Sequence, residues 1–141
     1  MGFHARLVIL GLVAPLAAPL PGADVREVTL RSGEADVLAR NNCISGPLAA
    51  AVAVNRHPAW GIIPGTAWLH PDDTLQHSTC AIYEAGFELP PGYRDPAIEV
   101  QVLADNSAVI SLNGNLLGRA EGFERITAFG SSSARDFRLK N

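Results

Sequence analysis

Two turn signals set between alternating apolar runs constrain the fold more than any other feature of the sequence. From Ile98 to Ala104 every second residue is apolar, which is typical of a half-buried strand, because successive side chains of a strand point to opposite faces. The alternation returns from Ala108 to Leu112. Asn113-Gly114 then matches a two-residue hairpin turn, and Asp105-Asn106 carries turn chemistry as well. The stretch predicts a three-stranded antiparallel meander.

The first 23 residues have the layout of a secretory signal peptide. Arg6 precedes an apolar run of 14 residues from Leu7 to Leu20, and Gly22-Ala23 places small residues before the first acidic one. We expect cleavage after Ala23, which leaves residues 24–141 as a single β domain. The run is shorter than the roughly 20 residues of a membrane span, and an uncleaved membrane anchor is the alternative.

Charge and cysteine content narrow the choice of partners and compartment. The formal net charge is −3, so the composition favours neither nucleic acid nor an anionic membrane as a partner. Cys43 and Cys80 are an even count in a chain that we expect to be exported, which favours a disulfide over two buried free thiols. Such a bridge would close a loop of about 38 residues and stabilise the fold by about 3–4 kcal/mol.

The rest of the chain also favours strands over helices. Short alternating or apolar segments predict strands at residues 25–30, 35–38, 48–54, 66–69 and 79–89. From Arg56 to Pro71, three prolines and both tryptophans predict an ordered, extended loop pinned by aromatic anchors. Phe123, Ile126 and Phe129 are spaced by three, which leaves open a single helical turn or a loop that packs its aromatic rings inward.

Short motifs follow one another in a recognisable order from residue 57 onward. They are His57-Pro58-Ala59-Trp60, Pro64-Gly65-Thr66-Ala67-Trp68, Phe87-Glu88-Leu89-Pro90, Leu103-Ala104-Asp105-Asn106-Ser107-Ala108, Leu112-Asn113-Gly114 and Leu117-Gly118. In this order they resemble the galactose-binding-like domains of exported bacterial proteins, many of which carry a sorting tail of the PEP-CTERM type. The resemblance implies an all-β fold, an antiparallel β-sandwich of jelly-roll type, and a carbohydrate-binding role.

The C-terminal residues bear on the completeness of that sandwich. Phe137 to Asn141 resembles the approach to a closing strand, and no sorting tail follows. The resemblance therefore implies a domain that lacks its last strand or strands. A truncated reading frame and a strand supplied by a partner chain are the two alternatives.

Trp60 and Trp68 are the first candidate ligand-binding residues, because an exposed aromatic ring can stack on the apolar face of a sugar. The competing interpretation is that both rings plug the sandwich, and the usual burial of tryptophan favours it. His57, Asp105 and Asn106 complete the candidate set. We expect these five residues at one rim of the sandwich.

Neither a metal site nor a cofactor is predicted. Asp105, Asn106 and Asn113 carry oxygens that suit Ca²⁺, but turn chemistry explains all three, so structural calcium stays an alternative without a motif. Other residue types that ligate metals or transfer protons occur at His57, His70, Asp72, Asp73 and His77. They match no fixed ligand spacing, and we interpret them as solvated loop.

No pattern indicates catalysis, since the sequence has no nucleophile elbow and no recognisable pair of catalytic carboxylates. We therefore predict that the chain is not an enzyme. The leading prediction is a secreted or envelope-exposed, non-catalytic module that binds a glycan or an extracellular matrix polysaccharide. A structural or adhesive surface domain with no small-molecule ligand is the alternative.

Overall fold

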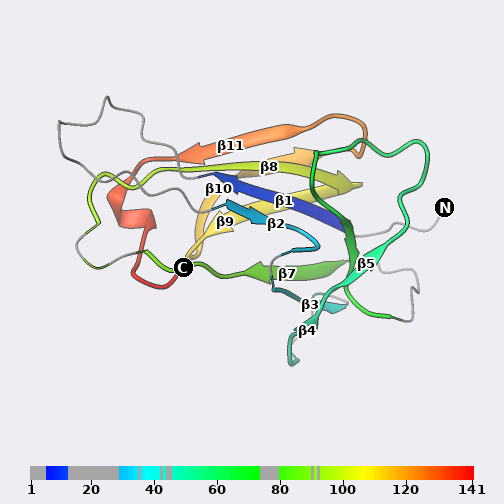
Figure 1. Ribbon diagram of the computed structural model, residues 1–141, viewed down its shortest axis with the longest axis horizontal. Helices are drawn as coiled ribbons and strands as arrows, with labels where there is room; N and C mark the ends of the chain where they lie inside the picture. The colour runs from blue at the N-terminus through cyan, green and yellow to red at the C-terminus, as the bar shows by residue number, and fades with distance from the viewer. Residues whose placement is uncertain are drawn as a thin grey trace.

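Antiparallel strands account for nearly all the regular structure of the chain (Figure 1). The computed structural model describes residues 6–12, 29–34, 36–41, 43, 46–73, 80–89, 91 and 93–141, with the backbone alone for residues 6–12. Within these residues the one helix is a single turn of 3-10 helix, η1 (Ala134–Asp136). The all-β prediction is confirmed, and the strands form two facing layers.

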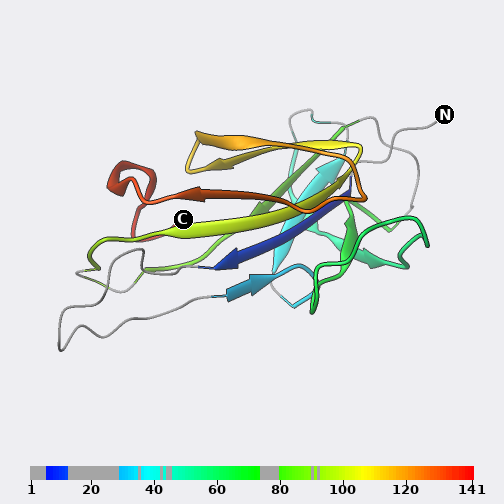
Figure 2. The same cartoon turned by 90° about the horizontal axis from the view of Figure 1, so that it is seen from above.

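One layer is a six-stranded sheet with the order β11-β8-β1-β6-β5, in which β2 also pairs with β1. Its strands are β1 (Arg6–Leu12), β2 (Thr29–Arg31), β5 (Val52–Val54), β6 (Trp68–His70), β8 (Ile98–Asp105) and β11 (Thr127–Ser131). β8 pairs with β1 over the whole length of β1 and with β11 along its other edge. β8 is therefore an interior strand (Figure 2).

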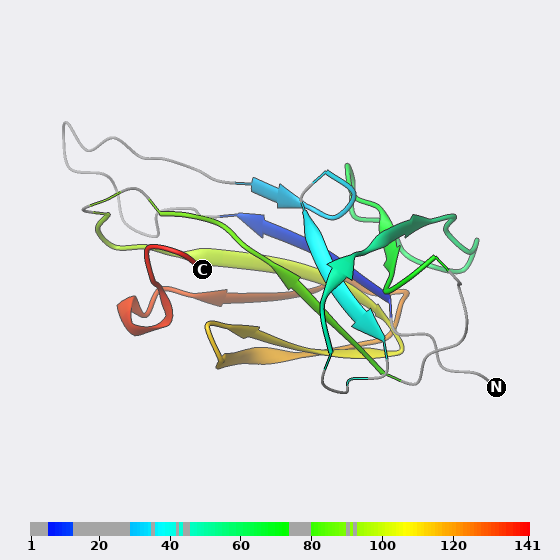
Figure 3. The same ribbon diagram turned by 90° about the horizontal axis from the view of Figure 1, so that it is seen from below.

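The other layer consists of a hairpin and a small sheet (Figure 3). The hairpin is β9 (Ser107–Leu112) with β10 (Asn115–Glu121), and the sheet has the order β4 (Ala49–Ala50), β3 (Val37–Asn41), β7 (Ala81–Ala85). Val100 and Val102 of β8 pack with Ile110 of β9 and Ala120 of β10, and Tyr83 of β7 lies against the same cluster. This contact between the layers makes the architecture sandwich-like.

The predicted meander is only half correct. Asn113 and Gly114 both have positive φ, 51° and 86°, and they close the β9–β10 hairpin as expected. β8, however, belongs to the other layer, so the Asp105-Asn106 turn carries the chain from one sheet to the other instead of closing a second hairpin. Alternation identifies the residues that face a core, but it does not identify the neighbouring strand.

Other predicted segments also form strands, with local differences. Residues 48–54 form two short strands, and Ala49 and Ala50 are exposed, so the prediction of one buried strand is wrong. Phe129 lies in strand β11, which excludes the helical turn considered for residues 123–129. Its ring lies where a Cβ on Gly118 would be, so the β10 backbone passes directly beneath the ring.

Both ends of the sequence take part in pairing. Residues 6–12, which begin the predicted signal peptide's apolar run, form β1. Ala23 and the expected cleavage site lie outside the described residues. Near the other end, the backbones of Phe87 and Asn141 exchange two hydrogen bonds of 2.9 Å, and the Asn113 side-chain amide donates to Asn141 Oδ1 at 2.7 Å. Among the described residues, none of the helical structure has the length and apolarity to cross a bilayer.

Candidate functional site

The predicted site loop is held in shape by its own side chains. One terminal nitrogen of Arg56 donates to the carbonyl oxygens of His57, Pro58 and Trp60, at 3.3, 3.2 and 2.6 Å. The backbone N–H of Ala59 donates to His57 Nδ1 at 3.2 Å. These bonds fold the chain tightly around the His57-Pro58 dipeptide, so the loop is ordered as predicted, but residues 57–60 form a turn and are not extended.

Both tryptophans are buried. Trp60 is 8% exposed and Trp68 is 4% exposed, and they form one apolar cluster with Ile63 and Leu103. Their ring centroids lie 4.7 Å apart, and Trp68 Nε1 donates to the Gly61 carbonyl at 3.1 Å. The packing interpretation is confirmed, and the proposed role of these two rings as sugar-stacking platforms is wrong in this conformation because their faces are covered.

Three chain segments that are distant in sequence meet beside this loop. The N–H of Gly61 donates to the Phe123 carbonyl at 2.6 Å, and the N–H of Gly122 donates to the Asn106 carbonyl at 2.6 Å. A Cβ on Gly61 would lie 3.1 Å from the Phe123 oxygen, so glycine permits the close approach. We call the resulting surface, residues 57–62, 104–106 and 122–124, the rim.

The rim brings together most of the predicted candidates but exposes few of them. His57 and Asn106 are exposed, whereas Asp105 is buried at 8% exposure. The His57 ring centroid is 5.7 Å from that of Trp60, with the planes tilted by 47°. Ile62 is exposed as well, at 60%. The rim can therefore offer an imidazole, a carboxamide and a small apolar surface, but no broad aromatic platform.

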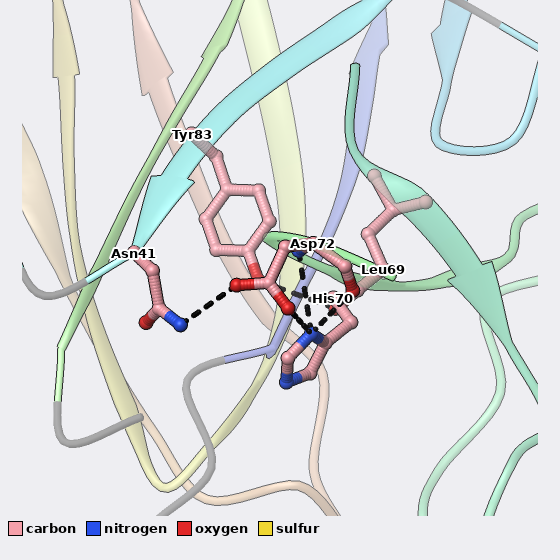
Figure 4. Close-up of polar contacts among 5 residues, drawn as sticks. All are labelled: Asn41, Leu69, His70, Asp72 and Tyr83. Atoms are coloured by element: carbon pink, nitrogen blue, oxygen red, sulfur yellow. Dashed lines mark hydrogen bonds and ion pairs between the residues drawn. The ribbon is translucent and has the colours of Figure 1, made fainter. Parts of the chain in front are cut away.

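A second group of polar side chains, which includes no rim residue, surrounds His70 (Figure 4). His70 is only 1% exposed, so its assignment to a solvated loop is wrong. His70 Nδ1 lies 2.9 Å from the Asp72 carbonyl oxygen and 3.6 Å from Asp72 Oδ1. The side-chain amide of Asn41 donates to Asp72 Oδ2 at 2.8 Å, and the Tyr83 hydroxyl donates to the Leu69 carbonyl at 3.3 Å.

This group, which we call the joint, connects the two layers. His70 ends β6 in the six-stranded sheet, whereas Asn41 and Tyr83 belong to β3 and β7 of the small sheet. A buried histidine in contact with a carboxylate is also a common acid–base arrangement in enzymes. Here Asp72 accepts a hydrogen bond from Asn41 of β3, and Tyr83 of β7 donates to the Leu69 carbonyl of β6. These contacts hold strands of the two sheets together, which is a structural role.

A disulfide reinforces the same end of the small sheet. Cys43 and Cys80 are bonded, with their Cα atoms 5.4 Å apart, which confirms the predicted bridge. Asn41 lies two residues before Cys43, and Tyr83 lies three residues after Cys80. Proximity to the two cysteines is the sequence signal that could have identified Asn41 and Tyr83, which the sequence reasoning missed.

The metal-ligand residue types do not converge. His57 lies at the rim, His70 and Asp72 lie in the joint, Asp73 is exposed, and His77 lies outside the described residues. Within the described part of the chain, no three His, Cys, Asp or Glu side chains group as metal ligands would.

Of the three candidate calcium ligands, Asn113 is kept apart from the other two. Asn106 precedes β9 and Asn113 follows it, so a strand of six residues separates them. At about 3.3 Å per residue that distance is roughly 20 Å, too far for one ion. Asn113 is explained as a turn residue by its positive φ in the β9–β10 hairpin. Its side-chain amide is used in a hydrogen bond to the Asp136 carbonyl at 2.7 Å.

Comparison with protein-family models, with curated proteins and with solved structures found no match for this chain. The architecture and the contacts described above are therefore the basis for a functional proposal.

Proposed function

We propose that this chain is an exported, non-catalytic module that binds a glycan at the rim through polar contacts. The observation that carries the proposal is the bonding of three separate loops into one surface, through Gly61 to Phe123 and through Gly122 to Asn106. A surface fixed in this way loses little conformational entropy when a ligand binds. His57 and Asn106 are exposed on it and supply hydrogen-bonding groups that suit hydroxyls.

The remaining parts of the proposal have support of their own. The Cys43–Cys80 disulfide is compatible with an oxidising compartment such as the cell exterior, which supports export. The His70–Asp72 pair is occupied in joining strands, which supports a non-catalytic role. With both tryptophans buried, we expect weak binding, because a net hydrogen bond is worth only about 0.5–1.5 kcal/mol.

A dense glycan array probed with the oxidised, folded chain tests this proposal, since dense display raises the effective affinity of weak sites. We expect a signal that Asn106→Ala abolishes and His57→Ala weakens. Asn115→Ala is the matched control, because Asn115 is an exposed amide at the far end of the β9–β10 hairpin. A signal that all three variants reduce equally would contradict binding at the rim.

A structural or adhesive surface domain is the second candidate, and the burial of both tryptophans favours it. Their rings contribute to packing, the disulfide links the two neighbouring strands β3 and β7 of the small sheet, and the joint fastens that sheet to the large one, which suits a domain under mechanical stress. The absence of any glycan signal on the array would support this candidate and reject the first. The circular dichroism spectrum of the oxidised protein is the check that the protein on the array is folded.

A further inference from the structure

β1 occupies a central position in the six-stranded sheet. It pairs with β8 from Arg6↔Asp105 to Leu12↔Glu99. Along its other edge it pairs with β2 at its C-terminal end and with β6 at Leu7↔Leu69 (Figure 2). Without β1, one whole edge of β8 would have no strand beside it, and β2 and β6 would lose their link to the rest of the sheet.

The exposed edge would be an unusual one, because β8 is built as an interior strand. Val102 and Leu103 are both 0% exposed, and they belong to two different apolar clusters on opposite faces of the sheet. Edge strands of stable proteins are normally short, charged or covered. A bare β8 edge between two cores therefore favours the addition of another strand.

The residues of β1 also belong to the predicted signal peptide, and removal of that peptide would conflict with their place in the sheet. The segment Arg6–Leu12, RLVILGL, forms the strand, and from Leu7 it is also the start of the apolar run of a signal-peptide layout. Cleavage after Ala23 on export would remove β1 from the mature chain. The sheet that remains would be complete except for its central strand.

We propose that the gap between β8 and the β2–β6 edge is a strand-acceptor site. In the uncleaved chain β1 fills it, and in the mature chain it binds an extended segment of a partner polypeptide, antiparallel to β8. The chemistry of the site defines the partner: about seven residues, apolar on both faces because β8 separates two cores, and free of proline. The edge of this site includes the rim residues Ala104 and Asp105, but the proposal does not require a glycan at the rim.

The experiment starts from the full, oxidised chain with a site-specific protease site inserted between Ala23 and Asp24. After folding, the chain is cut and mixed with a fluorescent peptide of residues 5–13 that carries solubilising lysines at its ends. We expect the peptide to exchange with the cut segment and to bind the remaining chain. The unfolding temperature should then rise with peptide concentration, as mass action requires.

Two controls distinguish strand addition from non-specific hydrophobic binding of the peptide. The uncut chain, whose gap is filled, should not bind the labelled peptide. A peptide with N-methyl groups on alternate residues keeps its apolar side chains but loses ladder hydrogen bonds, and it should bind at least about tenfold more weakly.

Three results from the binding and unfolding measurements would overturn the proposal. They are equal binding of the methylated and unmethylated peptides, equal binding by cut and uncut chains, and loss of the cut segment with no change in unfolding temperature. Precipitation of the cut chain that excess peptide prevents would support the proposal, whereas precipitation that the peptide does not prevent would reject it.

Discussion

At Gly118 the absence of a side chain allows the Phe129 ring to lie against the hairpin. Gly118→Ala should lower the free energy of unfolding by about 1–3 kcal/mol, because the added Cβ overlaps the ring and forces it to move. Urea denaturation measures the change. Gly46→Ala is the matched control, since no heavy atom lies within 4 Å of the Cβ position at Gly46. Equal losses in the two variants would show that the ring contact does not set the effect, because the lower chain entropy of alanine should itself stabilise the fold.

The two His-Pro dipeptides predict opposite outcomes for the same substitution. His70→Ala should lower the free energy of unfolding by about 2 kcal/mol or more, because it leaves a cavity and unpaired polar groups in the joint. His57→Ala removes an exposed ring and should change it by no more than about 0.5 kcal/mol. Guanidinium denaturation of both variants checks the ranking, and a reversed order would mean that the joint contributes little.

The same pair shows the limit of local sequence patterns. His57-Pro58 and His70-Pro71 read alike, yet one lies on the rim and the other ends a buried strand. Burial at residue 70 follows from the strands that β6 meets, which are distant in sequence. The tryptophans were easier to predict, because large aromatic rings beside prolines are buried in most settings.

Among the elements, the β3–β7 pair depends most on a covalent bond. The double variant Cys43→Ser/Cys80→Ser should lose about 2–5 kcal/mol of unfolding free energy, because its unfolded chain is no longer cross-linked. Denaturant unfolding with and without reductant measures this loss. Reductant should have no effect on the double variant, and two free thiols in unreduced, denatured wild-type protein would contradict the bridge.

The positions of the strands were predicted better than the strands with which they pair. The β9–β10 hairpin follows from Asn113-Gly114, because few other sequences tolerate two consecutive positive φ angles. The crossing at Asp105-Asn106 could not be predicted, since a turn residue serves a hairpin and a change of sheet equally well. β1 could not be predicted either, because its apolar run has no alternation to mark a strand.

At the scale of the whole molecule, β8 contributes side chains to two apolar clusters, and we expect the two clusters to unfold as one cooperative unit. Val102→Ala and Leu103→Ala remove side chains from opposite faces, and each should lower the free energy of unfolding by about 1.5–5 kcal/mol. Val109→Ala, at a residue that is 67% exposed, is the control and should have little effect. Calorimetry should show one transition in every variant, whereas two separate transitions would mean that the clusters unfold independently.

The all-β class and the sandwich-like layering followed from the alternating runs and from the resemblance, whereas the jelly-roll connectivity stays a prediction. The rim was predicted from the order of motifs, but the accessibility of its members was not. Trp60 and Asp105 lie within the rim segments and are nevertheless buried. Whether a side chain at a loop faces solvent depends on the loop packed beside it, here residues 122–124, which no local pattern reveals.

The two crossings that join the β9–β10 hairpin to the six-stranded sheet lie at the same end of the sandwich. Asn106 links β8 to β9, residues 122–126 link β10 to β11, and the two crossings are bonded at 2.6 Å through Gly122. At the opposite end the Asn113 side-chain amide donates to the Asp136 carbonyl and to Asn141 Oδ1, and the neighbouring Leu112 packs against Leu89 and Phe137. The β9–β10 hairpin is therefore attached to the rest of the fold at both of its ends, by backbone bonding at Asn106 and by side chains at the Asn113-Gly114 turn.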